Sequence, residues 1–303
     1  MSTSPGHSSG GINQRSFAPE GVQLNYAAGP PNGPPLLLLH GVGRHWQTCL
    51  PLMTTLALRW QLFALDFRGH GRSSRTPGKY RVIDYAADVA AFLRDEVRQP
   101  AVLFGHSLGG MVTMHVAAHH PQMVRAAVLG DNPITLRKHK SSMYADLFGG
   151  LLRLGQSGGT VEELARAIAE IQVRTPSSDV PTRIADLPGN DQAYLFSWAR
   201  CLSQVDPDVF RMTLDGSSRQ GWDGEECLRR MKCPTLLLQA NPKLGALMSD
   251  DDVKLAVKTL AHSVCVRLED HSHALHMQKP ESVLRAVMHF LEGLADEGKG
   301  CSD

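Results

Sequence analysis

The chain has 303 residues, 42% of them hydrophobic, and its 31 Lys and Arg residues almost balance its 30 Asp and Glu residues. A formal net charge of +1 gives no electrostatic reason to expect a nucleic acid, an anionic membrane or an acidic partner. The length suits one large domain or a domain with an insertion, and no apolar run approaches the roughly 20 residues of a membrane span.

Residues 1–14 are polar and rich in Ser and Gly. They lack the charged start and apolar middle of a secretory signal, so we expect a disordered tail. The cysteines are scattered without a C-x-x-C pair, which is typical of reduced thiols. These features favour a cytoplasmic protein, and we expect a flexible C-terminus over 298–303.

Short apolar runs alternate with helix-like stretches along much of the chain. Strands are expected over 22–28, 34–41, 61–67, 101–105, 126–130, 235–239 and 264–268. Helices are expected over 84–97 and 280–294, where apolar residues recur with the helical period and Pro280 suits a first turn. This alternation predicts an α/β fold, with a parallel sheet covered by helices on both faces.

One long segment, 134–230, contains no convincing strand. Residues 161–172 and 192–205 have helical patterns, separated by clusters of Gly, Ser and Pro. We therefore expect a helical insertion over one face of the sheet, between core segments 15–133 and 231–297.

The stretch "LFGHSLGGM" (103–111) places Ser107 between Gly105 and Gly109, after an apolar strand and before a helix. It could be an ordinary turn. The spacing G-x-S-x-G instead favours a nucleophile on a sharp strand-to-helix turn, where side chains at the glycine positions would collide with the backbone.

A second glycine-rich stretch, "LLLLHGVGRHW" (36–46), also follows an apolar strand. A serine nucleophile needs hydrogen-bond donors for the oxyanion that develops on its substrate. The backbone N–H groups of Val42 and Leu108 are candidates for this oxyanion hole. The alternative is again a plain turn.

Four motifs together, "HGVG", "DFRGHGRS" (66–73), "GHSLGG" and "HALHMQKPESV" (273–283), resemble the α/β-hydrolase superfamily. The resemblance covers about 15–133 and 231–295. It implies an eight-stranded, mostly parallel sheet flanked by helices, with 134–230 as an inserted helical cap. It also implies Ser107 as nucleophile, with Val42 and Leu108 as oxyanion donors.

The resemblance places the catalytic base in the loop after the last strand, seven residues before a Pro-Glu pair. His273 has that spacing from Pro280, so we favour it over His271 and His276. The three histidines could alternatively ligate a metal through H-x-H-x-x-H spacing. A serine nucleophile gives a metal no role, so we expect neither metal nor cofactor.

The acid of the triad has three candidates. Many relatives carry an Asp after strand seven, but Asn241 stands near that position here. Asp250 follows it, within a sequence typical of a helix cap. Asp131 ends the strand-like run 126–130, where some relatives place their acid, and we favour it.

A serine nucleophile predicts acyl transfer to the enzyme followed by hydrolysis. A carboxylic ester is the expected small-molecule substrate. C–C bond, lactone, thioester and amide hydrolysis, perhydrolysis, and a small-molecule receptor or regulator are the alternatives. We expect His106 to contact the substrate. The oligomeric state is left open. Arg44 could face the entrance, and apolar lining could come from Trp46, Met111, Phe196 and Trp198.

Overall fold

The computed structural model describes residues 11–135 and 142–297. Most of the predicted tail 1–14 and all of 298–303 therefore lie outside the described residues. The first strand begins at Asn13, so the prediction of disorder was wrong for residues 13 and 14.

Eight strands form one mostly parallel sheet, as predicted. They are β1 (Asn13–Phe17), β2 (Leu24–Ala28), β3 (Pro35–Leu39), β4 (Gln61–Leu65), β5 (Ala101–His106), β6 (Val124–Gly130), β9 (Thr235–Ala240) and β10 (Ser263–Leu268). Their order is β1-β2-β4-β3-β5-β6-β9-β10. β2 pairs antiparallel with β1 and β4, and the other neighbours are parallel.

The residue pattern missed β1 because its sequence, NQRSF, is largely polar. Four of its five residues are exposed, as an edge strand allows. Its pairing with β2, from Asn13 opposite Ala28 to Phe17 opposite Leu24, depends on backbone hydrogen bonds that an apolar pattern does not reveal.

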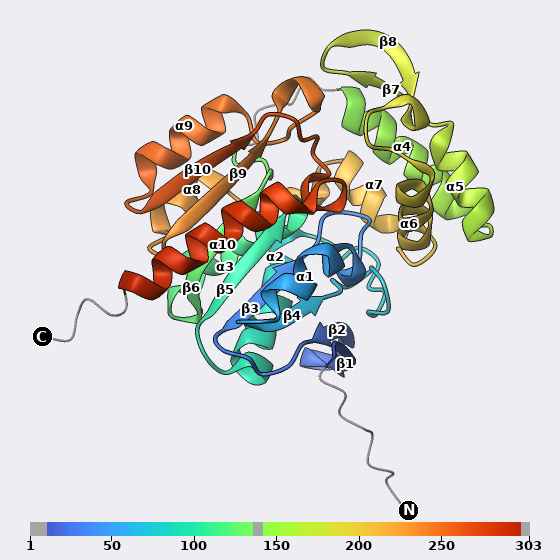
Figure 1. Ribbon diagram of the computed structural model, residues 1–303. Helices are drawn as coiled ribbons and strands as arrows, with labels where there is room; N and C mark the ends of the chain where they lie inside the picture. Colours follow the sequence, from blue (N-terminus) through green and yellow to red (C-terminus); the bar gives the residue numbers. More distant parts are fainter. Residues whose placement is uncertain (1–10, 136–141, 298–303) are drawn as a thin grey trace, which may run out of the picture.

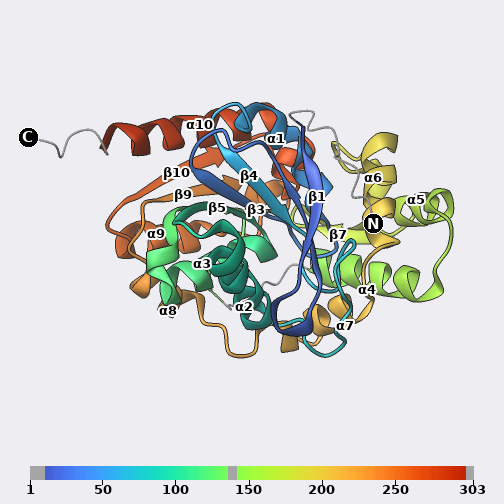
Figure 2. The same cartoon turned by 90° about the horizontal axis from the view of Figure 1, so that it is seen from below.

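Among the described residues, six helices cover the sheet. They are α1 (Leu50–Leu56), α2 (Val82–Phe92), α3 (Leu108–His119), α8 (Gly224–Arg230), α9 (Asp250–Thr259) and α10 (Pro280–Glu297). α1 and α10 lie on one face, and α2, α3, α8 and α9 lie on the other (Figures 1 and 2).

The position of β3 in the sheet explains why its sequence is a continuous apolar run. Leu36 and Leu38 are buried in the cluster that includes residues of α1 and α10, whereas Leu37 and Leu39 are buried in the cluster that includes residues of α2 and α3. Side chains of a strand alternate between faces, so a strand covered on both sides needs apolar residues at every position.

Between β6 and α8 lies a segment that projects from one end of the sheet (Figure 1). We call residues 142–214 the insert. It contains α4 (Ser142–Ser157), α5 (Val161–Ala169), β7 (Gln172–Thr175), β8 (Ser178–Arg183), α6 (Gln192–Leu202) and α7 (Asp208–Leu214).

The expectation of helices alone in this segment was wrong, because β7 and β8 form an antiparallel hairpin. Both strands are short, and every residue of β8 is at least partly exposed, so neither carries an apolar run. The predicted helix 161–172 ends earlier, at Ala169, where the chain turns into β7.

Helix α8, which follows the insert, packs against α3 in the layer that covers the sheet. Within the described ranges, no helix combines the length and apolar character that crossing a bilayer requires.

Candidate active site

Ser107 lies on the turn between β5 and α3. Its φ of 55° is unusual for a residue other than glycine, and conformations of this kind, which cost about 1–3 kcal/mol, cluster at functional sites. A Cβ on Gly105 would overlap the Gly109 carbonyl oxygen, and one on Gly109 would overlap the Leu39 carbonyl oxygen. The glycines are therefore required by backbone crowding, as the motif predicted.

His273, in the loop after β10, contacts Asp131 at the end of β6. The distance between His273 Nδ1 and Asp131 Oδ2 is 2.7 Å, so Nδ1 donates to the carboxylate. His273 Nε2 has no hydrogen-bond partner among the described residues, and His273 lines the same cavity as Ser107. His273 and Asp131 are thus in direct contact, and Ser107 lines the same cavity as His273.

The Asp131 carboxylate is fully buried and held by the backbone of the loop after β9. Oδ1 accepts N–H bonds from Ala240 and Met248, each at 3.2 Å, and Oδ2 accepts one from Leu247 at 2.9 Å. Asp131 itself has a φ of 45°. A buried carboxylate is costly unless it is well bonded, and these donors satisfy it while fixing its direction.

The other two candidate acids point elsewhere. Asn241 Oδ1 accepts from the Lys243 N–H, and its amide donates to the Glu269 carbonyl. Asp250 accepts from Gln239 Nε2 at 2.8 Å and pairs with Arg267 at 3.1 Å. Neither contacts His273.

The histidines near His273 have separate partners. His271 Nδ1 bonds Asp270 at 2.7 Å, and its Nε2 bonds the Ser282 hydroxyl at 2.8 Å. His276 is buried against the rings of Phe104 and His106, and burial lowers its pKa to about 3. The three imidazoles do not converge on one point as metal ligands would.

A different group could offer ligands to a metal. His115 and His119 on α3 and Cys227 on α8 have ligand atoms within 4.8 Å of one another. None of them lines the cavity beside Ser107. Burial raises the pKa of the Cys227 thiol to about 12, so a metal there would have to displace its proton.

The turn from Gly41 to Trp46 is held by the "DFRGHGRS" stretch. Asp66 accepts the Trp46 N–H at 2.7 Å, and His70 Nε2 accepts the Gly43 N–H at 3.1 Å. Burial raises the pKa of Asp66, although its hydrogen bonds from Trp46, Arg72 and Asn25 oppose the rise. Burial also lowers the pKa of His70 to about 4, which keeps the imidazole neutral and able to accept.

Val42 and Leu108 carry the candidate oxyanion donors. Neither backbone N–H has an acceptor among the residues of 11–135 and 142–297. Val42 lines the cavity, and Leu108 is the first residue of α3. A helix N-terminus favours negative charge, so both positions suit a developing oxyanion.

His106 connects the serine turn to the histidine loop. Its Nε2 donates to the His273 carbonyl oxygen at 2.7 Å, and the two ring centroids are 4.8 Å apart. Burial lowers the pKa of His106 well below its usual value, so the ring is neutral. Besides lining the cavity, His106 thus positions the backbone of the expected base.

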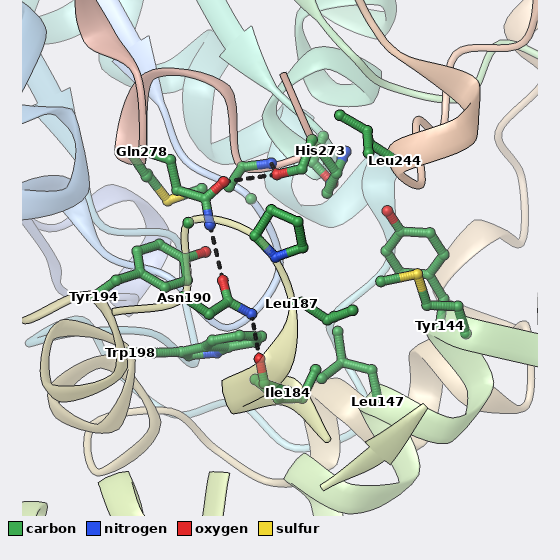
Figure 3. A pocket seen from close by; sticks show the side chains of 18 of the residues that line it. Tyr144, Leu147, Ile184, Leu187, Asn190, Tyr194, Trp198, Leu244, His273 and Gln278 are labelled. Carbon is green, nitrogen blue, oxygen red and sulfur yellow. Dashed lines mark hydrogen bonds between the residues drawn. The ribbon is translucent and has the colours of Figure 1, made fainter. Parts of the chain in front are cut away.

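A cavity of about 340 Å³ lies between the sheet end and the insert. We call its lining residues from 142–214 the insert wall and its other lining residues the core wall (Figure 3). Of the predicted substrate contacts, Arg44, His106 and Trp198 line this cavity. Trp46, Met111 and Phe196 pack in the hydrophobic core instead.

Several lining residues were not anticipated from the sequence. The helix α4 contributes Tyr144, Leu147, Phe148 and Leu151, whose spacing of three, four and seven is that of one helical face. That periodicity was the available signal. The Gly149–Gly150 pair within it weakens helix propensity and hides it.

The family comparison matches residues 34–280 to the alpha/beta hydrolase fold. The chain therefore belongs to the α/β-hydrolase family, and it is a hydrolase of this fold. The sheet order agrees with that assignment.

Two relatives illustrate the range of similarity in sequence. A 100-residue stretch is 39% identical to 2-(acetamidomethylene)succinate hydrolase from Mesorhizobium japonicum, covering 33% of this chain but only 36% of that protein. Pimeloyl-acyl-carrier-protein methyl ester esterase from Neisseria meningitidis is 26% identical over 273 residues, which are 87% of this chain and 78% of that one. In structure, the crystal structure of a membrane phospholipase A has a TM-score of 0.72 at 25% identity, covering 94% and 87% of the two chains.

Proposed function

We propose that this protein hydrolyses a carboxylic ester, or a related acyl compound, through an acyl-enzyme on Ser107. The observation that carries the proposal is the placement of Ser107 and His273 on one cavity, with His273 Nδ1 bonded to Asp131 at 2.7 Å. That arrangement leaves Nε2 as the imidazole nitrogen available to the serine hydroxyl.

In the proposed reaction, Ser107 Oγ attacks the substrate carbonyl while His273 Nε2 takes the hydroxyl proton. Asp131 accepts the Nδ1–H and stabilises the imidazolium. The N–H groups of Val42 and Leu108 bind the oxyanion of the tetrahedral intermediate. His273 then protonates the leaving alcohol, and a water deprotonated by His273 releases the acid and restores Ser107.

Support for an ester comes from the Neisseria relative, which is named a methyl ester esterase. The Mesorhizobium relative is named a hydrolase of an acetamido compound, so amide cleavage by the same steps is the nearest alternative. We also propose that the insert acts as a cap over the site, and that the protein works in the cytoplasm without a cofactor.

The test is covalent labelling with a fluorophosphonate probe, followed by mass spectrometry of the labelled peptide. Labelling at Ser107, and loss of both labelling and 4-nitrophenyl ester turnover in Ser107→Ala, are expected. Ser203→Ala, an exposed serine on the insert side, is the matched control and should behave as the parent. Labelling elsewhere, or full turnover in Ser107→Ala, would refute the proposal.

A further inference from the structure

Arg44 brings a positive charge into the cavity without an anion beside it. The residue is 9% exposed, and its guanidinium donates from Nη2 to the Tyr194 hydroxyl at 3.0 Å. It stacks 4.2 Å from the Trp198 ring centroid. It forms no ion pair with a carboxylate in the described ranges.

A second buried arginine provides the contrast. Arg68 is also 9% exposed, but its guanidinium makes two bonds to the Asp88 carboxylate, at 2.7 and 2.6 Å. Burying a charge is costly unless it is paired and hydrogen-bonded. The fold meets that requirement at Arg68 and leaves it unmet at Arg44, where the side chain lines a ligand-sized cavity.

The polar groups around Arg44 do not supply the missing charge. Burial raises the pKa of the Tyr194 phenol, and it raises that of the Cys201 thiol to about 11, so both are neutral near pH 7. Burial likewise lowers the pKa of His45 to about 4. Arg44 is therefore a single cation among neutral partners.

The rest of the cavity wall adds to the positive charge. Lys279 is paired with Asp270 at 2.8 Å, and Asp270 also bonds His271. Lys243 lines the cavity at an exposed position and forms no ion pair with the described residues. Once Lys279 and Asp270 cancel, the described lining keeps two positive charges and no opposing negative one.

We propose that the substrate carries a carboxylate, separate from the group that is cleaved, and that this carboxylate binds the Arg44 guanidinium. The planar guanidinium can bond a carboxylate through two parallel N–H groups. Of the two remaining cations only Arg44 is buried, because Lys243 is exposed to solvent. One buried cation offsets one carboxylate, whereas a phosphate monoester would bring about −1.5 to −2. This inference rests on the proposed function, because it names the class of acyl substrate for the same site.

Arg44 follows Val42 by two residues, on the turn that carries a candidate oxyanion donor. A half-ester of a short dicarboxylic acid would place its reacting carbonyl and its free carboxylate a few bonds apart. Half-esters of this kind are therefore the expected substrate class. Simple alkanoate esters fill the apolar part of the cavity but leave Arg44 unpaired.

The test compares two esters with five-carbon acyl chains, mono-4-nitrophenyl glutarate, which ends in a carboxylate, and 4-nitrophenyl pentanoate, which ends in a methyl group. In the parent protein, kcat/KM for the glutarate ester should exceed that for the pentanoate ester by about tenfold or more. Arg44→Gln should lower this ratio by roughly 10- to 100-fold, the range for losing charge-assisted hydrogen bonds. Arg200→Gln, an exposed arginine of α6, removes the same net charge and should change the ratio less than about twofold.

An unchanged ratio in Arg44→Gln would overturn the inference, whether kcat/KM stays the same with both esters or falls equally with both. An equal fall would mean that Arg44 serves the reacting carbonyl or the fold. In either case, fluorophosphonate labelling of Ser107 would leave the proposed function standing. Arg44→Lys, which keeps the charge but loses the planar fork, replaces Arg44→Gln if that variant unfolds, and the ratio should then fall about 3- to 10-fold.

A binding experiment covers the case in which no ester is cleaved. Calorimetry on Ser107→Ala should show hexanoate binding at least about tenfold more tightly than hexanamide, which has nearly the same shape without the charge. Loss of that preference in the Ser107→Ala, Arg44→Gln double variant supports the inference independently of turnover. Equal affinity for the two ligands in Ser107→Ala rejects it.

Discussion

The two walls of the cavity are built by different means. On the core wall, Ser107 and His273 are held by hydrogen bonds that mostly involve the backbone, and the residues behind them are buried. The insert wall instead presents side chains from α4 and α6, including Tyr144, Leu147 and Trp198, and from the segment that joins β8 to α6.

This difference separates the groups that carry out the reaction from the side chains that select the ligand. Acyl transfer needs donors and a base placed within a fraction of an ångström, which strained turns and buried networks can provide. A wall made of apolar side chains sets the size and shape of a ligand but can change without moving those groups. Substitutions of Ser107, His273 and the groups that hold them should therefore affect kcat, whereas those on the insert wall should affect KM.

The largest effect is expected from His273→Ala. Removing the base of a serine triad has cost about 2 × 10⁶ in kcat, and a loss of about 10⁴ to 10⁶ is expected in turnover of a 4-nitrophenyl ester. The folded protein should remain, since His273 is at the cavity surface and not in the core.

His271→Ala is the matched control for that measurement. His271 bonds Asp270 and Ser282 and does not itself line the cavity, so its removal should lower thermal stability while leaving kcat within about tenfold. A greater loss of kcat in His271→Ala than in His273→Ala would show that the wrong histidine has been assigned as the base.

Asp131→Asn should have the next largest effect. The amide keeps the shape of the carboxylate but removes its charge and can favour the wrong imidazole tautomer, a change that has cost about 10⁴ in kcat in a serine protease. Steady-state kinetics with a neutral ester is the measurement, with circular dichroism to confirm folding.

Two further variants test whether Asp131 alone fills this role. Asp250→Asn loses an interaction with Arg267 on the surface, and Asn241→Asp changes a residue that caps a short helix. Both should keep kcat within about threefold. Near-parental turnover in Asp131→Asn would instead mean that the partner of His273 comes from the loop after β9.

The sequence predicted the core wall well because its geometry constrains residue type. Gly105 and Gly109 have no room for a side chain, and the apolar runs of β3 and β5 are required by burial on both faces. Such constraints leave short motifs in the chain. The contact between Asp131 and His273 joins residues 142 positions apart and could be placed only through the resemblance.

The insert wall was harder to predict for the same physical reason. Many apolar residues can line a cavity, and a lining residue has the same pattern as a core residue. Trp198 lines the cavity, whereas Phe196, two positions earlier on α6, packs against the core. The β7–β8 hairpin is largely exposed and polar, so it left no strand pattern to find.

Acid should lower the stability of the folded protein through His276, which packs against the core-wall residue His106. Its pKa is about 3 in the folded protein against about 6.5 in an unfolded chain. Between these values the unfolded state binds the extra proton, so stability falls as pH falls. Between pH 7 and 5 this histidine should account for about 2 kcal/mol of lost unfolding free energy.

His276→Leu is the variant that isolates this contribution. Both ring nitrogens of His276 are buried without partners among the described residues, so an apolar replacement should not reduce stability at pH 7. Urea unfolding at pH 7 and pH 5 should show a smaller difference between the two conditions in the variant. An unchanged difference would mean that other groups carry the acid sensitivity.

The smallest effect is expected where the two walls are joined. Gln278, from the loop before α10, donates to Asn190 Oδ1 at 2.8 Å, and Asn190 donates to the Ile184 carbonyl at 2.8 Å (Figure 3). The Ser272 hydroxyl, next to His273, bonds the other end of the Gln278 amide at 2.8 Å. A chain of three hydrogen bonds thus connects the loop of the expected base to the insert.

Gln278→Met keeps the length of the side chain and breaks this connection. Each partly buried bond contributes about 0.5–1.5 kcal/mol, so the insert wall should become less well placed and KM should rise about 3- to 10-fold. kcat should stay within about twofold, because Asp131 and the backbone around it still fix His273. Gln220→Met, at an exposed position outside the cavity, is the control. A fall in kcat with unchanged KM would show that the insert also positions the base, and that the two walls are not independent.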